Sequence, residues 1–104
     1  MIPSVVVGSF TGNGAAQDII IGFEPAHVIL VDSTNGNLVE QWFRGMAAGT
    51  SINDSGAAPA IRAAPNGMTA IRTTSGEGFR VGAALSVNGA TMRYTALRSG
   101  PGAK

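Results

Sequence analysis

The dipeptide Asn-Gly occurs four times in this chain, and its recurrence restricts the possible fold more than any other feature. The pairs are Asn13-Gly14, Asn35-Gly36, Asn66-Gly67 and Asn88-Gly89. A type I′ turn needs positive φ at both central residues, and Asn and Gly tolerate that conformation best. The sequence therefore predicts that these eight residues form the turns of four β-hairpins.

The segments that flank these pairs have the composition of β-strands. They are rich in Val, Ile, Thr and aromatic residues, over 4–11, 18–22, 27–33, 38–44, 68–74, 79–87 and 91–98. In 91–98, Met92, Tyr94 and Ala96 alternate with Thr91, Arg93, Thr95 and Leu97, as in a strand with one packed face. No window longer than about ten residues has helical periodicity free of Gly and Pro. We expect an all-β fold, an antiparallel β-sandwich or barrel of about seven to eight strands.

Length limits the chain to one domain, because 104 residues can bury only one thin core. We expect a single β-sandwich domain over 1–98 and a flexible tail over 99–104. The segment 45–65 has only isolated apolar residues and is expected to form a long loop or an irregular strand pair, and to protrude or contact a partner. The absence of Cys excludes disulfides and thiol chemistry. The longest apolar run, Val28–Val31, is far too short to cross a membrane.

The two halves of the chain carry opposite charge. Residues 1–43 contain four acidic and no basic residues, whereas residues 44–104 contain two acidic residues, six Arg and Lys104. Two interpretations stay open: paired strands from the two halves neutralise each other within one sheet, or acidic and basic faces meet between subunits. The arginines are too dispersed for a phosphate-binding stripe, so we expect no nucleic-acid binding.

Residues able to perform catalysis or bind a metal are scarce. His27 is the sole histidine, and it could act as a base only with Asp18 or Glu24 nearby. The loop 8–14 lacks the Lys and the helix of a phosphate-binding loop. The oxygen-rich segment 32–37 lacks the closing Glu of a calcium loop. We therefore expect no enzyme activity, no cofactor and no metal.

The adjacent aromatic residues Trp42 and Phe43 suggest a contact surface. Neighbouring side chains on a strand point to opposite faces, so one of the two lies outside a single core. Trp, Phe and Arg are enriched in protein interfaces, which makes Trp42, Phe43 and Arg44 candidates, together with Met46 and Ile52. Packing of Trp42 against its own chain, or stacking of Trp42 on a sugar, are the alternatives.

Several motifs together resemble a module of structural proteins from tailed bacteriophages. They are Gly8-Ser-Phe-Thr-Gly-Asn-Gly14, Ile19-Ile-Ile-Gly-Phe-Glu-Pro25 with the strand 27–32, Gly78-Phe-Arg-Val-Gly82, Val87-Asn-Gly89 and Tyr94-Thr-Ala-Leu-Arg98. The resemblance covers most of the chain outside 45–65 and the tail. It implies a virion β domain, and not an activity.

The resemblance implies that the protein resides in the virion, assembled in the host cytoplasm. We expect a small stand-alone capsid decoration (cement) subunit that binds the shell in many copies. Its expected partners are the major capsid protein or other virion subunits, and it is expected to form a homo-oligomer, with a trimer favoured. The alternative is a tail-fibre or tail-tip module that binds a host-surface glycan or protein.

Overall fold

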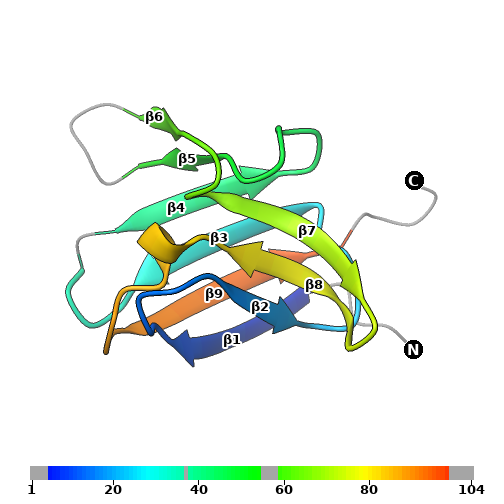
Figure 1. Cartoon of the computed structure of the whole chain (residues 1–104), viewed down its shortest axis with the longest axis horizontal. Coiled ribbons are helices and arrows are strands. Elements are labelled where there is room, and N and C mark those ends of the chain that lie inside the picture. Colours follow the sequence, from blue (N-terminus) through cyan, green and yellow to red (C-terminus); the bar gives the residue numbers. More distant parts are fainter. Residues whose placement is uncertain (1–4, 37, 55–58, 99–104) are drawn as a thin grey trace.

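The structure is a computed structural model that describes residues 5–36, 38–54 and 59–98, and these residues form an all-β fold (Figure 1). The elements are β1 (Val5–Thr11), β2 (Gln17–Ile20), β3 (His27–Asp32), β4 (Val39–Phe43), β5 (Ser51–Asn53), β6 (Ala60–Arg62), β7 (Met68–Thr73), β8 (Gly76–Val81), the short 3-10 helix η1 (Ala83–Leu85) and β9 (Thr91–Leu97). The described residues thus contain nine strands, more than the seven or eight predicted, because 45–65 contributes β5 and β6.

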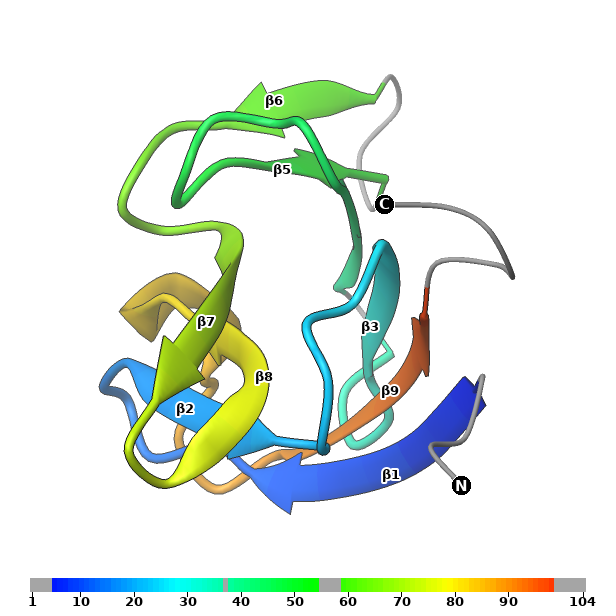
Figure 2. The ribbon, with the colours of Figure 1, turned by 90° about the vertical axis from the view of Figure 1, so that its right-hand side faces the viewer.

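The strands form two antiparallel sheets in a sandwich-like arrangement. One sheet has six strands in the order β1-β9-β3-β4-β5-β6, and the other has three in the order β2-β8-β7. In Figure 2 the larger sheet curves from β6 at the top to β1 at the bottom, and the smaller sheet faces it. An isolated bridge between Thr50 and Met68 links the start of β5 to the start of β7.

The core lies between the two sheets and follows from the alternation of each strand. On β3, Val28 and Leu30 point inward, and on β9, Met92 and Ala96 do the same, as predicted for 91–98. The smaller sheet contributes Met68, Phe79 and Val81. Leu38, Trp42, Leu85 and Ala90 complete the buried apolar cluster. Because both sheets contribute to one cluster, the described residues form one packed unit.

The predicted hairpin is found at only one of the four Asn-Gly pairs. Asn35-Gly36 connects the paired strands β3 and β4. The other three pairs lie where the chain passes from one sheet to the other: Asn13-Gly14 after β1, Asn66-Gly67 after β6 and Asn88-Gly89 after η1. The prediction of four hairpins is therefore wrong, because a turn signal specifies a local reversal and not the strand that follows it.

The prediction of a type I′ turn is also wrong at each of the four pairs. No non-glycine residue in the described part of the chain has positive φ, so none of the four asparagines adopts the conformation that this turn requires. Gly14, Gly36 and Gly89 have positive φ, at 79°, 70° and 80°. The glycine alone supplies the left-handed conformation, which is typical of longer turns.

Two of the Asn-Gly loops bind each other at one end of the molecule. The Gly12 amide donates to the Ala90 carbonyl (2.9 Å), and the Gly89 amide donates to the Gly12 carbonyl (2.9 Å). The Asn13 amide donates to Ser86 Oγ (3.1 Å). A Cβ added to Gly12 would lie 1.9 Å from the Val87 carbonyl oxygen, so only glycine fits there.

The opposite charges of the two halves meet within the molecule. Arginines from the second half pair with acids from the first half at 2.6 Å in three ion pairs, Arg80–Asp18, Arg72–Glu24 and Arg62–Glu40. Asp18 and Arg80 are direct cross-strand partners on β2 and β8. The prediction of neutralisation within the fold is thus confirmed for these pairs.

The segment 45–65 forms the predicted irregular strand pair, with β5 and β6 paired in it. Residues 55–58 and the predicted tail 99–104 lie outside the described residues.

Replacing Gly12 by Ala tests the close packing of the two loops. We expect Gly12→Ala to lower the free energy of unfolding by about 3 kcal/mol or more, because the new methyl group collides with backbone that cannot rotate away. The control is Gly89→Ala, which meets no atom within 4 Å and suffers only the positive φ, costing about 1–2 kcal/mol. Urea denaturation measures both, and equal losses would contradict the packing described.

Candidate contact surface on the six-stranded sheet

The face of the six-stranded sheet that points away from the core is rich in apolar side chains. Strand register places one row across all six strands: Val7, Thr95, Ile29, Gln41, Ile52 and Ile61. A neighbouring row contains Val5, Leu97, His27 and Phe43. We call these two rows the outer face. Val7 is 74% exposed, Ile61 64% and Phe43 42%, so the outer face presents apolar surface to the solvent.

A chain of polar contacts crosses the outer face beside Phe43. The His27 ring stacks on the Phe43 ring, with centroids 4.3 Å apart and planes 11° from parallel. His27 Nε2 lies 3.1 Å from Gln41 Oε1, and Gln41 Nε2 donates to Asp54 Oδ2 at 2.8 Å. These contacts fix the orientation of the exposed Phe43 ring. A pre-oriented aromatic side chain loses less conformational entropy when it is buried in an interface.

The structure separates the adjacent aromatic residues and corrects the role expected of Trp42. Trp42 points into the core and is 4% exposed, so its placement in a contact surface is wrong. The reason is its position on β4, because it shares the inner face with Leu38 and Glu40. Phe43 takes the exposed position that one of the two residues had to occupy.

The other three candidates lie at different distances from the core. Ile52 belongs to the outer face and is partly buried. The Met46 sulfur accepts a hydrogen bond from the Phe43 amide (3.4 Å), and its side chain packs against the core cluster. Arg44 Nη2 donates to the Glu24 carbonyl (3.1 Å), which ties this exposed side chain to the turn before β3. Of the five candidates, Phe43 and Ile52 therefore lie on the outer face.

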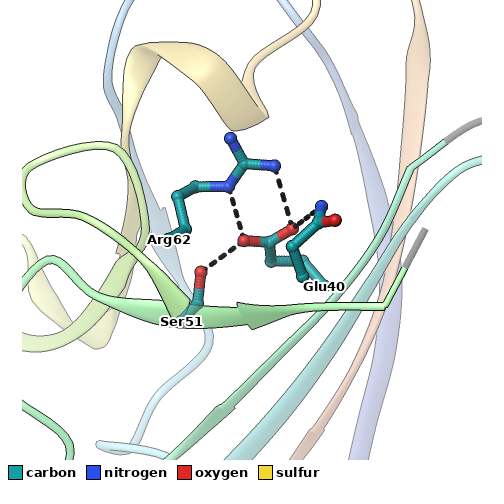
Figure 3. Close-up of polar contacts among 4 residues, drawn as sticks. Glu40, Ser51 and Arg62 are labelled. Carbon is teal, nitrogen blue, oxygen red and sulfur yellow. Dashed lines mark hydrogen bonds and ion pairs between the residues drawn. The ribbon is translucent and has the colours of Figure 1, made fainter. Parts of the chain in front are cut away.

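A buried charged cluster holds the strands β5 and β6 against β4 (Figure 3). The Glu40 carboxylate is fully buried and accepts hydrogen bonds from Arg62 Nε (2.6 Å) and Arg62 Nη2 (3.2 Å). Ser51 Oγ (2.6 Å) and Asn53 Nδ2 (2.8 Å) donate to the same carboxylate. Both carboxylate oxygens are thus satisfied, as a buried charge requires. Through these bonds the cluster positions Ile52 and Ile61 on the outer face.

The sequence indicates that Glu40 is buried, but it does not indicate which arginine pairs with it. Glu40 alternates with Leu38 and Trp42 on β4, so a carboxylate falls on the face that the two apolar neighbours bury. A buried carboxylate needs a cation, but six arginines were available and strand order was unknown. Val7 and Ile61 were missed as surface residues because apolar strand residues are usually buried.

In the oxygen-rich segment, residues 32–36 form a hydrogen-bonded turn. Asp32 Oδ1 accepts from the amides of Thr34 (2.9 Å) and Asn35 (2.8 Å), and Asp32 Oδ2 accepts from Asn35 Nδ2 (2.9 Å). These bonds to Asn35 and Thr34 lower the pKa of Asp32. The carboxylate therefore stabilises the β3–β4 hairpin. The described residues contain no group of three or more side chains able to hold a metal ion.

Salt should distinguish the two carboxylates whose pKa is lowered. Arg80 lowers the pKa of Asp18 mainly through its hydrogen bond, and the charge of Arg80 adds to this. Neutral donors lower the pKa of Asp32. Both carboxylates favour the folded state above the ordinary pKa of 3.8, and this contribution is lost as the pH falls below that value.

We expect a titration followed by carboxyl-carbon NMR to show the pKa of Asp18 rising part of the way towards its ordinary value in 1 M salt. The screening length is then about 3 Å, so the contribution from the charge of Arg80 weakens while its hydrogen bond remains. The pKa of Asp32 should stay low under the same conditions. Equal changes at both sites would contradict the assigned causes.

Truncation of Arg62 tests whether the buried cluster anchors the strand pair. Arg62→Ala leaves the Glu40 carboxylate buried without a counter-ion, so we expect a loss of about 3 kcal/mol in the free energy of unfolding. Arg98→Ala, at an exposed position, is the control and should change stability by less than about 0.5 kcal/mol. If the two variants unfold alike in urea, the cluster does not anchor β5 and β6.

Within the residues that the structure describes, no helix is long and apolar enough to cross a membrane. Asp18 and Glu24, the carboxylates that could have oriented His27 as a base, are paired with Arg80 and Arg72.

The chain matches no protein-family model, no curated protein and no solved structure.

Proposed function

We propose that this protein is a structural subunit of a virion, a capsid decoration subunit that binds the shell through the outer face. The observation that carries the proposal is the exposed apolar surface of the two rows. Its exposed large side chains are Val7, Ile61, Val5 and Phe43. An apolar patch of this kind on a small domain is typical of a protein contact site. The resemblance to bacteriophage structural proteins supplies the setting.

The chemistry of the outer face suits a permanent protein contact. Its rows combine aliphatic side chains with one oriented aromatic ring and carry few charges, as in the centre of an interface. The major capsid protein or another virion subunit is the proposed partner. The outer face has no cluster of basic side chains, which argues against nucleic acid as the partner.

The location of the protein on particles tests the proposal first. Gold-labelled antibody against the purified chain should decorate the heads of phage particles from a culture of the source. Label at the tail tip would favour the alternative function, and absence of label from all particles would overturn the virion role.

Substitutions on the outer face of the larger sheet and on the exposed surface of the smaller sheet test which surface docks. We expect the double variant Phe43→Ser/Ile61→Ser to lower occupancy on particles at least tenfold, because it removes two exposed apolar side chains from the proposed contact. The control is Ile20→Ser on the smaller sheet, since Ile20 is 41% exposed and Phe43 is 42% exposed. Quantitative gel analysis of purified particles measures occupancy. Equal occupancy of both variants would show that another surface docks.

The alternative is a tail-fibre or tail-tip module that binds a host-surface glycan or protein, and its glycan-binding form now depends on Phe43. Burial of Trp42 removes stacking of Trp42 on a sugar, which the sequence left open as an alternative. Phe43 remains exposed beside the hydrogen-bonded Gln41 and Asp54, a combination of ring and polar groups that could hold a sugar. Glycan binding by the isolated chain that Phe43→Ser abolishes would support this function over decoration.

A further inference from the structure

The edge strand β1 lacks the features that usually protect a sheet edge. It has seven residues, forms an unbroken register with β9, and contains neither charged residues nor proline. The other edge strands in the described part are shorter and carry charged residues: β2 has Asp18, β6 has Arg62 and β7 has Arg72. An exposed, uncharged edge of this length is a template for pairing with another strand.

The hydrogen-bond pattern shows which backbone groups of β1 are free to pair. The Gly12 amide donates to the Ala90 carbonyl, and this pair continues the register in which Phe10 lies opposite Met92. Hydrogen-bonded pairs alternate along an antiparallel ladder, so the even-numbered residues of β1 bond to β9. The amides and carbonyls of Val5, Val7 and Ser9 therefore point away from the sheet.

We propose that two copies of this chain pair through β1, antiparallel, about a two-fold axis at Val7. In this register Val7 lies opposite Val7 of the second copy, and Val5 lies opposite Ser9, so every free group from Val5 to Ser9 finds a partner. A register centred further along would use the Thr11 carbonyl, which already accepts a hydrogen bond from Gln17 Nε2 (2.9 Å). Pairing of this kind is self-complementary, as a two-fold contact requires.

The second copy is the favoured occupant because the joined sheets match in side chains as well as in backbone. In the dimer the row that contains Val7 continues into the same row of the second copy, and Val7 itself is 74% exposed in a single copy. Arg93 is the outward-pointing cation on β9, one strand in from the edge. In the dimer it is separated from Arg93 of the second copy by three strand spacings, or at least about 14 Å. This distance exceeds the screening length of about 8–10 Å at physiological ionic strength. Among the residues that the structure describes, Arg93 therefore does not oppose the contact.

Pairing through β1 joins the two outer faces into one continuous surface. The contact gives a dimer, which differs in mass from the trimer expected from the sequence. It also requires no virion, so its failure and the failure of the proposed function are separate results.

Proline at Val7 tests the pairing with little disturbance of the fold. The Val7 amide points away from β9, so Val7→Pro removes a donor only from the free edge, where proline is tolerated. In the dimer the same change removes both central hydrogen bonds and should weaken association about 10- to 100-fold. Val7→Thr keeps the amide and the branched side chain and is the matched control. Fluorescence of the buried Trp42 checks that both variants fold.

Sedimentation equilibrium and amide hydrogen exchange give the two measurements. We expect a dimer for the unmodified chain and for Val7→Thr, and a monomer for Val7→Pro at the same concentration. In the dimer the amides of Val5, Val7 and Ser9 should exchange slowly, and in the monomer fast, while Val6 and Gly8 stay protected in both. A monomeric unmodified chain, a trimer, or a dimer unaffected by Val7→Pro would overturn the proposal.

Discussion

The carboxylate of Glu40 determines how far the six-stranded sheet extends. Up to β4 the inner face of that sheet packs apolar side chains against Met68, Phe79 and Val81 of the smaller sheet. Beyond β4 the polar residues Ser51, Asn53 and Arg62 lie on the inner face, and they converge on Glu40. Strands of three residues are too short to be stable alone, so their position depends on this buried charge.

The outer face follows from the same arrangement, since alternation along each strand couples the two faces. When Glu40 and Trp42 point inward, Gln41 and Phe43 must point outward. When Ser51 and Arg62 reach the carboxylate, Ile52 and Ile61 are placed on the opposite surface. A buried ion pair therefore extends an exposed apolar surface from β1 to β6. The price in desolvation of Glu40 is offset by hydrogen bonds to both of its oxygens.

Local patterns predicted much of the fold. The strands 27–32, 39–43, 68–73 and 91–97 lie within segments chosen for composition, and the alternation around Met92 and Ala96 is as expected. The internal pairing of opposite charges was also accessible, since both halves had to lie in one small domain. Nothing local indicated that Asn13-Gly14 and Asn88-Gly89 change sheets, because a turn residue specifies φ and not strand order.

The contact surface was less accessible to sequence reasoning. Alternation separates Trp42 from Phe43 but does not say which of them is inward, and that depends on the partners that β4 finds in β3 and β5. Val7 and Ile61 are residue types that usually lie in the core. They are exposed because their strands, β1 and β6, form the two edges of the larger sheet. Edge position is a property of the topology, which sequence patterns left open.

The central claim is that the outer face of the six-stranded sheet is where the protein meets its partner. Hydroxyl-radical footprinting of the free protein and of the protein bound to the proposed phage particle would measure this most directly. Oxidation of Phe43 and Ile61 is expected to fall strongly on the particle, while Ile20, on the other sheet, should react equally in both states. Protection of Ile20 with unchanged reactivity of Phe43 and Ile61 would contradict it.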